Sequence, residues 1–260
     1  MIVLLMIDGL RPEAITAAGA PHLTHLMARG AGTRHARSVM PCITLPCHMS
    51  IFHAVPPSRH GVTTNTWSPM ARPVPGLVDL AHAAGQRCAF FFNWEPLRNL
   101  SQPGSLYFSH FHDNVQQLDG DDLISAEAVR WLPAHRPDFA FVYHGTTDEQ
   151  GHNHGWMSAE YLAQVARVDG LVGNLLAALR PDEDHLLIQA DHGGHDRSHG
   201  TEAPEDMTIP WMLAGPRIRS GYDITGPVSL LDTAPTLARL LGLTPDDHWE
   251  GRSVDEAFAA

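Results

Sequence analysis

The chain has 260 residues, of which 43% are hydrophobic, enough to bury the core of one α/β domain. We expect a single domain over residues 1–260, since no linker or repeat divides the chain. The formal net charge of −12 excludes a basic nucleic-acid groove and favours a small-molecule substrate. No apolar run approaches the roughly 20 residues that span a bilayer. We therefore expect no membrane attachment. The three cysteines cannot all pair, so we expect a reducing, cytoplasmic location.

Short runs rich in Val, Ile and Phe alternate with longer amphipathic runs, a pattern typical of a sheet flanked by helices. The predicted strands are Ile2–Ile7, Arg87–Phe92, Asp138–Tyr143, His185–Ala190 and Ile209–Ala214. The predicted helices include Pro21–Ala28, Leu45–Phe52, Gly76–Ala84, Leu123–Leu132, Ala159–Leu179 and Leu230–Leu241. Ser158 suits the N-cap of the fifth helix, and Gly242 suits the C-terminal stop of the last.

Acidic residues follow three of the predicted strands. Asp8 follows the first, Asp148 comes soon after the strand that ends at Tyr143, and Asp191 follows Ala190. Ligands of open α/β sheets bind at the carboxyl ends of the strands. We therefore expect these carboxylates, distant in sequence, to converge.

Histidines accompany two of these carboxylates. The 18 histidines outnumber the 17 lysines and arginines, which favours a metal site. Asp148 and His152 are four residues apart, so one turn can direct both at one ion. Asp191-His192 is followed by two glycines, which predicts a tight turn that presents both ligands.

Thr44 is the candidate nucleophile. It lies just ahead of Pro46, which suits the first turn of a helix, so its hydroxyl would meet free N–H groups and the positive end of a helix dipole. The alternative is that Thr44 only caps the helix. A hydroxyl beside a divalent ion can lose its proton near neutral pH and attack phosphorus, which favours the first interpretation.

The ordered motifs resemble those of the alkaline phosphatase superfamily, and most of all its nucleotide pyrophosphatase/phosphodiesterase branch, the type I phosphodiesterases. The residues that carry the resemblance are Asp8-Gly9, Thr44-Leu45-Pro46 with His48, His60-Gly61 with Asn65, Asp148 with Gly151-His152, Asp191-His192-Gly193, His199-Gly200, and Asp232-Thr233-Ala234-Pro235-Thr236-Leu237 with Gly242. The resemblance implies a three-layer α/β/α alkaline-phosphatase-like fold with a mostly parallel central sheet.

The resemblance also implies two divalent metal ions. Asp148, His152 and His199 would hold one ion, and Asp8, Asp191 and His192 the other, with Thr44 touching the second. His195 is the competing candidate for the third ligand of the first ion, but His199-Gly200 matches the family pattern better. Asn65 resembles the donor that, with the Thr44 N–H, stabilises a nonbridging phosphate oxygen; the alternative is a turn residue.

The implied reaction is hydrolysis of a phosphodiester or a nucleotide pyrophosphate bond through a covalent intermediate on Thr44. Zinc is the usual metal of this branch, and the mixed ligands are compatible with it or with manganese or iron. The segment from Val39 to Ser58 contains no Arg or Lys, which favours a singly charged diester over a monoester dianion. Arg34, Arg37, Arg59 or Arg72 could still reach the phosphate from a distance.

The sequence departs from the family pattern in its length. Only six residues separate His192 from His199, where many relatives carry a long insertion that shapes the pocket. Trp94 is the aromatic candidate for contacting a leaving group, against the alternative of a partly buried structural residue. Neither Cys42 nor Cys47 begins the proline-and-arginine pattern of sulfatases. A phosphomonoesterase or phosphomutase of the superfamily, and a non-catalytic metal-binding protein, remain as alternatives.

Overall fold

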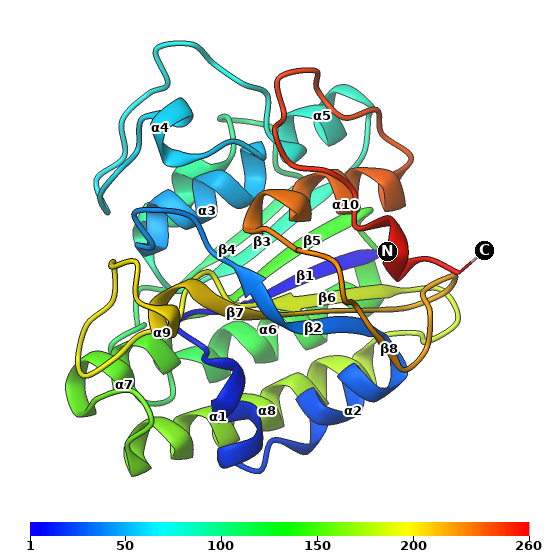
Figure 1. Cartoon of the computed structure of the whole chain (residues 1–260). Helices are drawn as coiled ribbons and strands as arrows, with labels where there is room; N and C mark the ends of the chain where they lie inside the picture. The colour runs from blue at the N-terminus through cyan, green and yellow to red at the C-terminus, as the bar shows by residue number, and fades with distance from the viewer. Residues whose placement is uncertain (260) are drawn as a thin grey trace.

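The computed structural model describes residues 1–259, and all of its strands belong to one sheet (Figure 1). The strands are β1 (Ile2–Ile7), β2 (Ala31–Arg37), β3 (Cys88–Phe92), β4 (Phe108–Phe111), β5 (Phe139–His144), β6 (His185–Gln189), β7 (Thr208–Ala214) and β8 (Tyr222–Asp223). Their order across the sheet is β4-β3-β5-β1-β6-β7-β2-β8. Strand β7 runs antiparallel to its neighbours β6 and β2, and the other neighbouring pairs are parallel.

Helices cover both faces of the sheet (Figure 1). One layer contains α3 (Thr44–His53), α4 (Pro57–His60), α5 (Leu77–Ala83) and α10 (Thr233–Leu241). The other contains α1 (Pro12–Ala17), α2 (Pro21–Arg29), α6 (Gly120–His135), α7 (Thr146–His154) and α8 (Ala159–Ala178). The short helix α9 (Pro204–Met207) precedes β7, and 3-10 turns cover Glu95–Leu100, Leu230–Asp232 and Asp255–Ala257. The predicted three-layer α/β/α fold with a mostly parallel sheet is confirmed.

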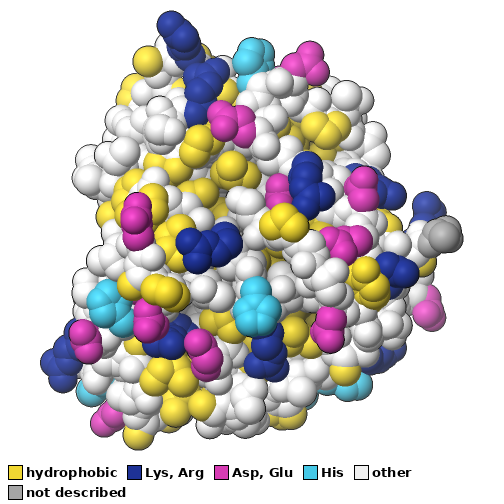
Figure 2. Space-filling view, in the orientation of Figure 1, with side chains coloured by type: hydrophobic (Ala, Val, Ile, Leu, Met, Phe, Trp, Pro, Cys, Tyr) yellow, Lys and Arg dark blue, Asp and Glu magenta, His cyan; other side chains and the backbone are white. Residues whose placement is uncertain are grey.

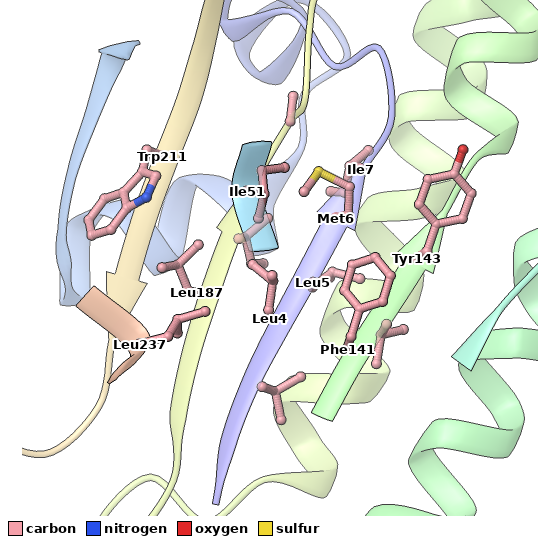
Figure 3. Close-up of a cluster of buried hydrophobic side chains, with 14 of the residues drawn as sticks. Leu4, Leu5, Met6, Ile7, Ile51, Phe141, Tyr143, Leu187, Trp211 and Leu237 are labelled. Carbon is pink, nitrogen blue, oxygen red and sulfur yellow. The ribbon is translucent and has the colours of Figure 1, made fainter. Parts of the chain in front are cut away.

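The core explains why the central strands are continuous apolar runs. All six residues of β1 are buried, because helices cover both of its faces. Figure 3 shows side chains of β1 among those of β5, β6, β7, α3 and α10, including Phe141, Leu187, Trp211, Ile51 and Leu237. Each such side chain contributes about 1.5–3 kcal/mol when it is removed from water.

The five predicted strands are confirmed to within one residue at each end, but three strands were missed. β2 (AGTRHAR) reads as a polar segment, β4 is a half-exposed edge strand of four residues, and β8 has two residues. The predicted helix Leu230–Leu241 begins instead as a 3-10 turn, and its α-helical part starts at Thr233. Short or polar strands carry little periodicity, because their pairing depends on neighbours distant in sequence.

Figure 2 shows basic and acidic side chains interspersed on one face, without a continuous basic stripe across it. Within residues 1–259, no helix is both long enough and apolar enough to cross a bilayer.

Candidate active site

The sheet brings the three predicted aspartates to one edge. Ile7, the last residue of β1, pairs with His144 at the end of β5, and Met6 pairs with Gln189 at the end of β6. Asp8 and Asp191 therefore leave neighbouring strands at the same edge, and Asp148 lies in the first turn of α7, just beyond β5. This placement agrees with the convergence predicted from the sequence.

The inner part of the site consists of Asp8, Asp191 and His192, which each offer one atom to a cluster within 4.8 Å. The Nε2 atom of His192 lies 3.3 Å from Asp8 Oδ1 and 3.4 Å from Asp191 Oδ2. All three side chains are buried. Their geometry suits one buried cation.

The outer part of the site consists of Asp148, His152 and His199. Asp148 Oδ2 lies 3.3 Å from His152 Nε2, and Asp148 Oδ1 lies 3.7 Å from His199 Nε2. The two imidazole Nε2 atoms are 3.2 Å apart. The rings of His199 and His192 stack at 3.8 Å, so the inner and outer parts are contiguous. The side chain of His152 is 39% exposed, and the outer part therefore opens toward solvent.

Each of the three histidines has Nδ1 within hydrogen-bonding distance of a backbone carbonyl. The distances are 2.8 Å from His192 to Gly193, 3.0 Å from His152 to Arg197, and 2.8 Å from His199 to Cys42. A neutral imidazole that donates from Nδ1 keeps its lone pair on Nε2. This arrangement is common among metal-ligating histidines, and it directs all three Nε2 atoms into the site.

One oxygen of each aspartate lacks a hydrogen-bond partner among the described residues. Asp8 Oδ1, Asp148 Oδ1 and Asp191 Oδ2 are buried and have no hydrogen-bond partner within the described chain. Burial, with the nearby charge of Asp191, raises the pKa of Asp8, and burial likewise raises the pKa of Asp191. Burial opposes ionisation of Asp148 as well, but the hydrogen bond with His152 lowers its pKa. Unpartnered buried carboxylate oxygens beside imidazole Nε2 atoms fit a site for divalent metal ions.

Thr44 lies at the inner part of this cluster. It is the first residue of α3, and Ile43 is the N-cap, so the structure does not support Thr44 as the helix cap. Its Oγ1 atom lies 3.4 Å from His192 Nε2. Asn65 is exposed, and its Oδ1 accepts a hydrogen bond of 3.0 Å from the Leu45 N–H. This contact holds the Asn65 side chain beside the residue that follows Thr44.

Two other histidines of the motifs lie in or beside α3. Buried His48 lies with Nδ1 2.7 Å from the carbonyl of Thr44, within α3. Buried His60 accepts a hydrogen bond from the Val62 N–H and contacts Ser50 Oγ at 3.1 Å. His48 Nδ1 also lies 3.6 Å from Asp191 Oδ2, whereas His60 connects α3 to the loop that carries Asn65.

His195, the competing candidate to His199, has a different partner. His195 pairs through Nδ1 with Asp206 Oδ1 at 2.6 Å, and its side chain is 37% exposed. The two glycines after His192 act differently from the prediction, since neither has positive φ. A Cβ on Gly193 would lie 2.1 Å from the Glu205 carbonyl, and one on Gly194 would lie 2.2 Å from the Trp156 ring. Close packing, and not a left-handed turn, requires glycine at both positions.

Sequence reasoning treated Asp148 and His152 as residues of one turn and missed what positions them. They lie on α7, whose first N–H groups, from Gly145 and Thr146, donate to the buried carboxylate of Asp121 at 2.9 and 3.2 Å. Asn93, directly after β3, donates to the same carboxylate at 2.8 Å. An anion at a helix N-terminus is favourable, so Asp121 holds α7 in place. Only the Asp-Asp pair at the start of α6 could have suggested an anchoring role.

Tyr143 is a second residue that the sequence did not single out. Its hydroxyl donates to Asp8 Oδ2, which leaves Oδ1 facing His192. Trp94, the aromatic residue predicted to contact a leaving group, is half-buried. It lines a cavity that is also lined by Glu149, the residue after Asp148.

Comparisons with known proteins give the family. A family model described as type I phosphodiesterase/nucleotide pyrophosphatase matches residues 2–208. The chain belongs to this family. It is 26% identical over 219 residues to human ectonucleotide pyrophosphatase/phosphodiesterase family member 1, a match that covers 74% of this chain and 23% of that protein. It is also 31% identical over 117 residues to zebrafish arylsulfatase K, covering 42% of this chain and 22% of the relative.

The solved structure of murine ectonucleotide pyrophosphatase/phosphodiesterase 5 shares the fold. The TM-score is 0.82 at 15% identity, and the match covers 99% of this chain and 100% of that chain. The chain spans less than a quarter of the length of the two curated relatives above.

Proposed function

We propose that this family member is a two-metal hydrolase of phosphodiesters or nucleotide pyrophosphate bonds that acts through a covalent phosphothreonine at Thr44. The observation that carries the proposal is the convergence of the Thr44 hydroxyl with three aspartates and three imidazole Nε2 atoms at one sheet edge. The expected substrate is a small phosphate ester or a nucleotide.

The donor atoms are suited to two divalent ions. Asp148, His152 and His199 would hold the outer ion, and Asp8, Asp191 and His192 the inner one, beside Thr44. When bound, such ions lower the pKa of a neighbouring hydroxyl or water and offset the negative charge of the phosphate. Zinc fits the mixed carboxylate and imidazole donors, and manganese or iron are compatible alternatives.

Thr44 and Asn65 would carry out the remaining steps of the reaction. Thr44 Oγ1 gives up its proton to solvent and attacks phosphorus while the bond from phosphorus to the leaving oxygen breaks, and the leaving oxygen takes up a proton from solvent. Water then attacks the phosphothreonine, restores the Thr44 hydroxyl and releases the product. The Thr44 N–H and the Asn65 Nδ2 group would donate to a nonbridging oxygen during both steps.

The arginines near the motif support a diester as substrate. The Arg34 side chain donates to the Pro12 carbonyl and to Thr16 Oγ1, and Arg59 donates to the Arg72 carbonyl. Both guanidinium groups are therefore engaged by partners outside the cluster around Thr44. A dianionic monoester would need such a cation in addition to the metals.

The alternatives explain less of the site. A sulfatase needs a modifiable cysteine, but Cys42 is a buried thiol whose Sγ donates to the Thr201 carbonyl, and Thr44 occupies the nucleophile position. A metal-binding protein without activity gives Thr44 and Asn65 no role. We also propose a reducing, cytoplasmic location, because all three cysteines are free and buried. Fractionation of the native host would test that location directly.

A substrate panel tests the proposed function. The purified chain, loaded with zinc, manganese or iron, is assayed with bis-nitrophenyl phosphate, a nucleotide nitrophenyl ester and nitrophenyl phosphate. We expect kcat/KM for the best diester to exceed that for the monoester by at least about tenfold, or roughly 1.4 kcal/mol in the transition state. A tenfold preference for the monoester would overturn the diesterase proposal.

A further inference from the structure

The loop of residues 193–201 contacts both imidazoles of the outer part of the site. His199 belongs to this loop, and the loop's Arg197 carbonyl lies 3.0 Å from Nδ1 of His152 on α7. The position of the loop therefore sets the directions of both Nε2 atoms, which are 3.2 Å apart. None of its residues, all of which the structure describes, lies in a helix or a strand. Contacts with neighbouring segments must therefore fix the loop.

Asp206, on α9, binds both ends of the loop, and its side chain is fully buried. Near the start of the loop, Asp206 Oδ1 lies 2.6 Å from His195 Nδ1. At the end of the loop, Asp206 Oδ2 accepts hydrogen bonds from the Thr201 N–H at 2.9 Å and from Thr201 Oγ1 at 2.7 Å. The Asp206 carbonyl also accepts a hydrogen bond of 2.8 Å from the Gly193 N–H. One buried residue thus connects the beginning and the end of the loop to α9.

The Asp206 carboxylate is suited to a structural task and not to metal binding. Burial opposes its ionisation, yet the hydrogen bonds with His195 and Thr201 lower its pKa. Both of its oxygens have partners, whereas each candidate metal-binding aspartate keeps one oxygen without a partner in the described chain. Hydrogen bonds to a charged acceptor are about twice as strong as neutral ones. Asp206 therefore acts on the loop.

Thr201 continues the connection toward His199. The Thr201 carbonyl accepts a hydrogen bond of 3.1 Å from Cys42 Sγ, and the Cys42 carbonyl lies 2.8 Å from His199 Nδ1. Thr201 and His199 are thus held against the same residue, which precedes Thr44 by two positions. A displacement of Thr201 would move His199 relative to its partner.

We propose that Asp206 is a positioning residue of the outer metal site. By fixing the loop at Thr201, it holds His199, and the carbonyl that orients His152, in the geometry that binds the outer ion. The inference rests on the metal assignment within the proposed function. Residues that orient metal ligands typically contribute 10–100-fold to metal affinity. The inner ion should be little affected, because its candidate ligands lie outside the loop.

Metal titration of the metal-free protein against a chelator tests the proposal. Asp206→Asn keeps the size of the side chain but replaces one acceptor oxygen with an amide NH₂ group, which opposes the donors around it. We expect Asp206→Asn to weaken binding of the outer Zn²⁺ at least tenfold and of the inner Zn²⁺ less than threefold. Asp169→Asn is the matched control, since Asp169 is 1% exposed and accepts two backbone hydrogen bonds at the start of the remote helix α2. It should leave both affinities within threefold of the parent.

Further variants separate positioning from a general loss of stability. In a His199→Ala background the outer ion is already lost, so adding Asp206→Asn should leave the affinity of the remaining ion within threefold. Thr201→Val removes the hydroxyl donor and should weaken the outer ion threefold or more, whereas Thr201→Ser should bind as the parent does. This pair tests the proposal even if Asp206→Asn does not fold. His195→Ala keeps both Thr201 bonds and should stay within threefold of the parent.

Amide hydrogen exchange of the metal-free protein tests the loop without metal or turnover. The Trp156 N–H donates to the Asp196 carbonyl, and the Ser198 N–H donates to the His195 carbonyl, so neither amide touches Asp206. Both amides should exchange at least tenfold faster in Asp206→Asn.

Three results would overturn the inference: an outer-ion affinity within threefold of the parent in Asp206→Asn, an equal loss in Asp169→Asn, or unchanged exchange of both amides. If the parent chain binds no divalent ion, the metal assignment of the proposed function fails. The exchange rates alone then decide whether Asp206 holds the loop.

Discussion

Buried carboxylates at the two ends of the central strands differ in their hydrogen-bond partners. At the start of β6, Asp184 receives two hydrogen bonds from Arg136 at 2.7 and 2.8 Å and one from the Arg180 N–H at 2.8 Å. The amino group of Met1 lies 3.4 Å away. At the other end of the same strands, Asp8 and Asp191 each have one oxygen without a hydrogen-bond partner in the described chain. Both carboxylates lie beside the neutral imidazole of His192.

The pKa directions express this difference. Burial opposes ionisation of Asp184, yet the hydrogen bonds from Arg136 leave its pKa lowered. Burial raises the pKa values of Asp8 and Asp191, and their mutual charge adds to the effect at Asp8. Asp184 therefore stabilises the fold by itself. Burial of the candidate-site aspartates costs free energy, and a bound cation would offset that cost.

The largest expected effect is on catalysis. Thr44→Ala should lower kcat by about 10³-fold or more and leave the fold and metal content nearly intact, because it removes the attacking atom. Steady-state kinetics and elemental analysis of the purified variant measure both. Thr44→Ser should retain part of the activity, and Thr24→Ala, on the remote helix α2, serves as the matched control. Near-parental turnover by Thr44→Ala would show that the covalent mechanism is wrong.

The next effect is on metal content. His199→Ala should lose most of one of the two bound ions, because it removes an Nε2 donor that lies 3.7 Å from Asp148 Oδ1. His195→Ala is the matched control and should retain both ions, since His195 pairs with Asp206 instead. Elemental analysis after dialysis against metal-free buffer decides between them. Full occupancy in the His199 variant, with loss in the His195 variant, would reverse the assignment of the ligand.

A smaller effect, on stability, is expected at the start of β6. Asp184→Asn should lower the free energy of unfolding by about 2 kcal/mol at pH 7, from the loss of charged hydrogen bonds. Since the folded-state pKa of Asp184 is lowered, its contribution is present above the unfolded pKa of about 3.9 and is lost as the pH falls through the folded-state value. Urea unfolding of both proteins in chelator at several pH values measures the difference. A difference that stays constant into strong acid would contradict this account.

The smallest expected effect has the opposite sign. In metal-free protein at pH 7, Asp8→Asn should raise the free energy of unfolding by about 1 kcal/mol, because it removes a buried charge. The folded-state pKa of Asp8 is raised, so its penalty grows as the pH rises above the unfolded pKa and disappears once Asp8 is protonated at low pH. At saturating metal concentration, the Asp8→Asn variant should instead be less stable than the parent protein. A destabilised metal-free variant would show that Asp8 is a structural residue.

The sequence by itself determined the strands of the centre and the types of residue at their ends. Short continuous apolar runs such as Ile2–Ile7 are typical of strands buried on both faces, and aspartates that directly follow parallel strands meet at one edge. The order of the motifs along the sequence also indicated the family that the family model identifies. These features are local, so neighbouring residues are enough to specify them.

Only the tertiary structure decided how those residues are held. The carboxylate of Asp121 fixes the start of α7, and the Cys42 carbonyl orients His199, although each contact joins segments far apart in the chain. The cavity between Trp94 and Glu149 likewise exists only because β3 lies beside β5. Such contacts depend on packing between distant segments, which no local pattern of residues encodes.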